Sequence, residues 1–304
     1  MLFRSATGPV RNPNFSVMQY RTAGGDSYYH GFQSVLNRRL SAGLQFQASY
    51  TFSKSIDTGS VQSFSSEGLN TVVMQSLFDP NEGERGVSSF DARHVSSMSA
   101  TYELPFGKEW GGAAKAIASG WQLGGILNLG SGHPFTPILG SDNARVSTRS
   151  RGDHLRPDLR PGANANPVEG SSAGCGTNAN PALNFPAQEV GTVKHYFDPC
   201  SFILPNSGVA GVGILGNLGR NTLVGPGLAQ VDFTMKKKFN VSENNFFEFR
   251  MEVFNIFNRA NFRDPADTER TILDGNGNYN LRSGEITGTT TSARQIQFSL
   301  RYEF

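Results

Sequence analysis

The chain has 304 residues, of which 17% are charged and 37% hydrophobic, and its formal net charge is +2. Ordinary soluble domains carry about 25% charged residues, and a content of 35 Gly and 23 Phe suits many strands joined by Gly-rich turns. So small a basic surplus argues against nucleic acid as a partner. Helical membrane spans are excluded, because no apolar stretch reaches the required length of about 18 residues. If the chain crosses a membrane, strands must do so.

Alternation of apolar and polar residues recurs along the chain. In the clearest segment, 43–53, apolar residues such as Leu44 and Phe46 alternate with polar residues such as Gln47. This length matches a strand that crosses a bilayer, whereas strands of soluble sandwiches usually stop at about five or six residues. Similar or weaker patterns occupy 14–22, 28–38, 94–104, 121–131, 230–239, 246–253 and 295–304. The sequence therefore predicts an all-β fold of about eight strands.

The later strands indicate which environment each face meets. Phe233 and Met235 share one face of their strand, and Asp232, Thr234 and Lys236 share the other. A charged face requires water, whereas the apolar face can meet lipid without a thick protein core. The pattern favours a transmembrane β-barrel with a wet lumen.

The predicted links differ in length between the two sides of the sheet. On one side they are short, at 40–42, 105–120 and 240–245, and on the other they are long, at 54–90, 133–228 and 258–293. The link at 23–27 is the exception, since it is short on the long side. Short turns on one side and long extracellular loops on the other are typical of outer-membrane barrels. We expect an antiparallel meander whose strands pair in chain order.

Motifs that suggest chemistry have simpler explanations. Gly211 to Gly216 spells a dinucleotide fingerprint, but no strand, helix or later acid accompanies it. Asp274 and Glu285 stand at calcium-loop spacing, yet Tyr279 occupies the sixth position, where the tight turn requires Gly. Arg151-Gly152-Asp153 is a three-residue match that we interpret as coincidence. The five histidines are scattered, and no nucleophile elbow occurs. We expect no enzyme activity, no metal site and no cofactor.

The two cysteines, Cys175 and Cys200, both lie in the long link 133–228. Two cysteines in one exported loop most simply form a disulfide, and free thiols are the alternative. We expect the disulfide.

Several segments resemble the barrel domain of TonB-dependent receptors, especially the Oar-like group that carries a carboxypeptidase-regulatory-like domain at its N-terminus. The matching segments run from Tyr29 to Gln33, Leu44 to Asp57, Asp79 to His94, Gly216 to Gly227 and Glu252 to Phe262, and include the terminal strand. The resemblance implies a barrel of about 22 strands with a plug in its lumen. It also implies inward movement of a bulky ligand with energy relayed through TonB. With about eight strands and neither plug nor TonB-contacting segment, residues 1–304 are interpreted as the C-terminal portion of such a receptor.

The terminal strand resembles the assembly signal of outer-membrane proteins, in which a final aromatic residue is read by the barrel assembly machinery. The alternative is an ordinary amphipathic strand that stops at Phe. The expected signal comprises Ile296, Phe298, Leu300, Tyr302 and Phe304. The expected partners are therefore outer-membrane lipid, the assembly machinery, the TonB system through an N-terminal part, and an unidentified ligand.

Two other functions fit the sequence. A self-contained eight-strand barrel with an adhesive or structural role would be narrow and filled by side chains. A soluble β-sandwich that acts as a binding module would also show alternating strands. An in-frame plug upstream of the chain separates the receptor from the small barrel, and a requirement for detergent separates both from the sandwich.

Overall fold

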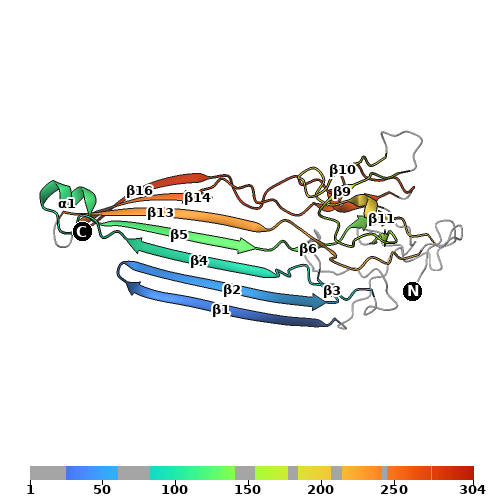
Figure 1. Ribbon diagram of the computed structural model, residues 1–304, viewed down its shortest axis with the longest axis horizontal. Helices are drawn as coiled ribbons and strands as arrows, with labels where there is room; N and C mark the ends of the chain where they lie inside the picture. Colours follow the sequence, from blue (N-terminus) through green and yellow to red (C-terminus); the bar gives the residue numbers. More distant parts are fainter. Residues whose placement is uncertain are drawn as a thin grey trace, which may run out of the picture.

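The computed structural model describes residues 25–60, 83–140, 155–176, 184–206, 214–241, 245–274 and 276–304. One antiparallel sheet forms most of it, with the strands side by side in chain order (Figure 1). The long strands are β1 (Ser27–Ser41), β2 (Leu44–Asp57), β4 (His94–Glu103), β5 (Trp121–Gly130), β13 (Leu228–Asn240), β14 (Phe246–Phe254) and β16 (Gln295–Glu303). A two-residue strand, β3 (Gly86–Val87), extends the pairing of β2.

The predicted all-β antiparallel meander is confirmed. Each long strand pairs with its neighbours in the order β1-β2-β4-β5-β13-β14-β16. Seven of the eight predicted strands correspond to these seven, and the segment 14–22 lies outside the described residues. Within the described part, β1 and β16 stand at opposite ends of the sheet and do not pair with each other.

The hairpin between β1 and β2 shows why the strands reverse where they do. Ser41 pairs with Leu44, which leaves Ala42 and Gly43 as a two-residue turn. Both have positive φ, at 51° and 80°, the combination that a tight hairpin turn requires. A Cβ on Gly43 would also lie 2.7 Å from the Glu103 carbonyl oxygen, so glycine is needed there.

The links differ in length between the two ends of the sheet, as the sequence predicts. One end carries the hairpin turn, the link 104–120 with helix α1 (Gly112–Ala118), and the link 241–245. The other end carries the long links 58–93, 131–227 and 255–294, whose described parts gather beyond the strand ends (Figure 1). We call these described parts of the long links the loop assembly. Neither α1 nor α2 (Asp267–Arg270) is long and apolar enough to cross a membrane.

The loop assembly contains short paired strands of its own. They are β6 (Pro134–Phe135), β7 (Ile138–Leu139), β8 (Asp158–Leu159), β9 (Ser171–Ser172), β10 (Gln188–Glu189), β11 (Phe202–Ile203), β12 (Leu223–Val224) and β15 (Thr271–Leu273), with a 3-10 turn, η2 (Pro199–Ser201). The pairing of β7 with β15 is parallel, and the other pairs are antiparallel. The antiparallel prediction therefore holds for the main sheet but not for every pair in the links.

Candidate functional site

Pairing in the main sheet sorts the side chains into an apolar face and a polar face. Phe233 of β13 pairs with Val253 of β14, and Val253 pairs with Ile296 of β16. Directly paired residues point to the same side of a sheet, so this apolar row is continuous. We call it, with its neighbouring rows, the lipid-facing surface. The faces match those that the sequence predicts for these strands.

The opposite face, here called the lumen face, carries charged side chains in paired positions. Glu252 pairs with Thr234 and Gln297, and Lys236 pairs with Arg250. The guanidinium of Arg250 lies 2.9 Å from Glu248 and 3.8 Å from Glu252. Such ion pairs between partly exposed groups are worth little in stability, but their charges require that this face meets water rather than lipid.

The lumen face is hollowed near the loop assembly. A cleft of about 280 Å³ is lined by the exposed ring of Phe90 together with Tyr29, Thr51, Ser53, Ser55, Asp91, Ala92 and Val95. Asp91 is fixed there, since one carboxylate oxygen accepts the Ser55 N–H at 2.6 Å and the other lies 3.4 Å from Arg93. The cleft thus combines hydroxyls, one carboxylate and two aromatic rings, a mixture that can hold a polar ligand with an apolar part.

The loop assembly has a hydrophobic core. Phe135, Phe197 and Phe202 are completely buried. The ring centroid of Phe197 lies 5.9 Å from that of Phe135 and 6.4 Å from that of Phe202. The other buried members of the cluster are Leu139, Leu155, Leu218, Leu223, Ile272 and Leu273. These residues come from two of the long links, 131–227 and 255–294, so the core holds those links together.

One buried ion pair fastens the assembly to the sheet, and a second joins two of its links. Arg220 pairs with Asp57, the last residue of β2, and Arg220 Nε donates to the Glu84 carbonyl oxygen at 2.9 Å. The guanidinium of Arg156 donates to both carboxylate oxygens of Glu84, each at 3.1 Å. Because these charges are almost fully buried, removal of one partner leaves the other without compensation.

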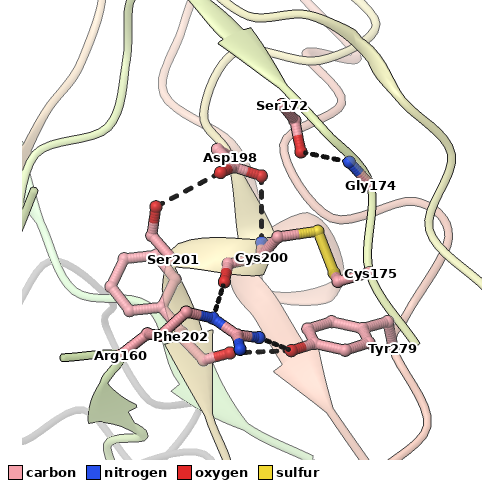
Figure 2. Close-up of a disulfide and its surroundings, with 9 residues drawn as sticks. All are labelled: Arg160, Ser172, Gly174, Cys175, Asp198, Cys200, Ser201, Phe202 and Tyr279. Atoms are coloured by element: carbon pink, nitrogen blue, oxygen red, sulfur yellow. Dashed lines mark hydrogen bonds between the residues drawn. A yellow bond between two sulfur atoms is a disulfide. The ribbon is translucent and has the colours of Figure 1, made fainter. Parts of the chain in front are cut away.

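A disulfide joins Cys175 to Cys200, with the Cα atoms 5.6 Å apart (Figure 2). Hydrogen bonds hold its surroundings, since Asp198 accepts from the Cys200 N–H and Arg160 Nε donates to the Cys200 carbonyl oxygen at 2.7 Å. Figure 2 also shows Arg160 donating to the hydroxyl of Tyr279, which in turn donates to the Phe202 carbonyl oxygen. Burial raises the pKa of the Tyr279 phenol, and the nearby Arg160 charge opposes that rise. The disulfide therefore lies in a rigid junction between two long links.

The described parts of the sequence motifs with a chemical interpretation do not assemble into a site. Gly216 packs against an earlier segment of its own link, where a Cβ would lie 2.0 Å from the Arg156 carbonyl oxygen, and no helix follows it within 214–241. Residues 211–213 and Arg151-Gly152-Asp153 lie outside the described part.

The calcium-like loop is closed by its own hydrogen bonds. Burial acts to raise the pKa of the Asp274 carboxyl, but bonds from Asn278, Asn276 and Gly277 outweigh it, and the pKa lies below the usual value. Glu285 pairs instead with Arg282 at 3.0 Å. Among the described residues, no group of three or more His, Cys, Asp or Glu could hold a metal ion.

Three of the four residues in the buried ion pairs lie in the sequence segments that carry the resemblance, and Arg156 lies in none of them. Asp57 ends the second of these segments, Glu84 lies within the third, and Arg220 lies within the fourth. Alternation cannot reveal such contacts, because Arg220 and Asp57 are 163 residues apart in the chain. The terminal aromatic residues, in contrast, lie where the alternation predicts, with Phe304 stacked on Tyr302 at a centroid distance of 6.1 Å.

Long antiparallel strands in a meander, one apolar face and one charged face define an outer-membrane β-barrel. A family model described as an outer membrane beta barrel domain matches residues 4–297, so the chain belongs to that family. Its location is the outer membrane. No curated protein matches the chain.

Proposed function

We propose that this chain is the C-terminal portion of a TonB-dependent receptor, which takes up a bulky ligand through the outer membrane. The observation that carries the proposal is the loop assembly. Long links with a shared core, a disulfide and buried ion pairs form a rigid surface beyond the strand ends. A barrel that is only a structural element has no need of so elaborate an extracellular surface, whereas a receptor must hold its ligand contacts in place.

The proposed barrel is larger than the described sheet. Across the described strands the sheet stays open between β1 and β16, which favours additional strands over a small closed barrel. A lumen wide enough for a plug requires about 22 strands. The charged lumen face of β13 and β14 suits contact with water and with a plug rather than a dry interior.

The proposed ligand-facing surface is the cleft beside Asp91 together with the loop assembly above it. Both lie at the long-link end, which is extracellular in outer-membrane barrels. Energy would reach the receptor from TonB through a region outside this chain. We propose no catalytic role for the chain.

A first experiment measures the size of the polypeptide that carries this sequence. An antibody against the β16 segment should detect, in outer membranes of the source bacterium, a protein much larger than the 32.9 kDa of the chain. A single band at 32.9 kDa would instead support the self-contained barrel.

A second experiment tests uptake. Cells with and without the gene are given fluorescent ferric chelates, oligosaccharides and peptides, each with and without a protonophore that dissipates the energy for TonB. The proposal expects the deletion to abolish energy-dependent accumulation of one of these classes. If deletion reduces cell adhesion while all uptake is unchanged, the adhesive alternative is correct and the transport proposal is wrong.

A further inference from the structure

The link 104–120 between β4 and β5, here called the interfacial link, exposes large apolar side chains at the short-link end of the sheet. Phe106, Trp110 and Ile117 are 63%, 58% and 69% exposed. Two exposed lysines, Lys108 and Lys115, alternate with them and outnumber the one exposed acid of the link, Glu109. An exposed segment that mixes aromatic, aliphatic and basic residues is typical of elements that lie in a membrane interface.

Two hydrogen bonds place the end of this link on the lipid-facing side of the sheet. Trp121 Nε1 donates to the Ile117 carbonyl oxygen at 2.9 Å, and Lys237 Nζ donates to the Ser119 carbonyl oxygen. Trp121 and Lys237 are paired residues of β5 and β13, and Lys237 also pairs with Phe249. They therefore belong to the lipid-facing surface, and α1 ends against that surface rather than against the lumen face.

Lys237 is the unusual member of that surface. It is only 1% exposed, and its ammonium lies 5.4 Å from the Trp121 ring centroid and 4.9 Å from that of Phe239. A lysine near the end of a lipid-facing row places its apolar stem against lipid and extends its ammonium group to the polar interface. Because the Lys237 ammonium donates to a carbonyl oxygen of the interfacial link, that link lies at the same depth as the polar interface of the membrane.

We propose that the interfacial link is a phospholipid-binding element, seated in the headgroup region of the periplasmic leaflet, where Lys108 and Lys115 bind anionic headgroups such as phosphatidylglycerol. Its apolar side chains continue the lipid-facing surface. When they are buried at the boundary between headgroups and acyl chains, they extend the contact that the barrel strands already make with lipid. The lysines supply charge complementary to the headgroup phosphate, and lysines near a membrane surface attract anionic lipid. Short links face the periplasm in such barrels, which identifies the leaflet.

The two tryptophans of the chain allow a direct test. Trp110 and Trp121 are the only ones in the sequence, and both lie in or next to the interfacial link. The outer-membrane protein that carries the chain, with Trp121 kept, and its Trp110→Phe variant are reconstituted into vesicles of phosphatidylcholine and phosphatidylglycerol, with bromine on one lipid at a time, and the difference between the two proteins gives the quenching of Trp110. Quenching of Trp110 then reports which lipid surrounds it. We expect quenching by both lipids, with brominated phosphatidylglycerol preferred.

The charge variants decide whether the preference is specific. Lys108→Gln and Lys115→Gln should each reduce the preference for phosphatidylglycerol, by up to about fivefold. Lys54→Gln, at the opposite end of the same face, is the matched control and should leave it unchanged. Equal quenching by the two lipids in the parent protein, or an equal effect of Lys54→Gln, would contradict anionic recognition. Absence of quenching in a chain that migrates as folded barrel would show that the link faces water or a protein, and would overturn the proposal.

Discussion

In the barrel sheet, Phe298 and Leu300 are 64% and 69% exposed, whereas Phe135 and Phe197 in the loop assembly are fully buried. Of the buried hydrophobic side chains in the described part, only Val253 belongs to a long strand. In soluble proteins the sheet carries the core and the links are exposed. Here lipid takes the place of the core for the sheet, and the links must supply a core of their own. The two regions should therefore respond to different substitutions.

The largest effect is expected in the loop assembly, from Arg220→Met. This change leaves the Asp57 carboxylate buried without its partner, which typically costs about 3–5 kcal/mol. The long links should become sensitive to protease in a barrel that still migrates as folded. Arg263→Gln removes an exposed arginine that donates to the Thr287 hydroxyl rather than to a buried carboxylate, and it is the control, with a much smaller effect. Equal sensitivity in the two variants would show that the buried pair does not fasten the links.

In the sheet, the neighbouring residues Phe233 and Thr234 make a matched pair on opposite faces. Phe233→Arg places a charge in lipid, at a cost of about 2–4 kcal/mol near the midplane, whereas Thr234→Arg meets the wet lumen. Phe249→Arg and Gln47→Arg form a second such pair. With these changes made in the complete outer-membrane protein that carries the chain, insertion into liposomes, followed by heat-modifiable migration on gels, should fail for the phenylalanine variants alone. Equal insertion of all four would contradict the assignment of the faces.

A smaller effect is expected from deletion of Phe304, because it alters recognition during assembly more than packing in the folded state. Phe304 is 95% exposed and contacts Tyr302 at the end of the last strand. Its deletion should lower the amount of folded protein in the outer membrane and increase periplasmic aggregate, since an unpaired terminal strand invites aggregation. Ser299→Ala, on the lumen face, should change neither quantity in membrane fractionation. An unchanged membrane level after the deletion would remove the evidence for an assembly signal.

The smallest effect concerns pH. Burial lowers the pKa of His195 below its usual value of 6.5, Lys194 lowers it further, and Glu285 opposes them. The folded loop assembly therefore binds a proton less readily than the unfolded links, and its stability should decrease as the pH falls below 6.5. The protection factor of the Tyr196 amide, which donates to the Gly284 carbonyl oxygen, should decrease in that range once the pH dependence of exchange in an unfolded chain has been divided out. His195→Gln should remove this pH dependence, and its persistence would assign the effect to another group.

The contrast between the main sheet and the loop assembly explains which features could be predicted from sequence alone. Alternation with a period of two depends on neighbouring residues, so the strands, their faces and the uneven links could be read from segments such as 43–53 and 246–253. The core of the loop assembly shows no sequence periodicity. Phe135 and Phe197 are in contact although they lie far apart in the chain, and a pattern of neighbouring residues cannot predict such a contact. Helix α1 was not anticipated either, since Gly111 and Gly112 at its start predict a turn. The disulfide was expected from the number and position of the cysteines rather than from their surroundings.

The central claim is that the strands cross the outer membrane, with the loop assembly outside and the interfacial link in the periplasm. Single cysteines at Leu281 and Ala114, both exposed and at opposite ends of the sheet, test it with a membrane-impermeant maleimide. Cys175 and Cys200 do not react while they remain joined. In intact cells Leu281→Cys should be labelled, and Ala114→Cys should be labelled only after the outer membrane is permeabilised. Labelling of both cysteines in intact cells, or of Ala114→Cys alone, would contradict the account.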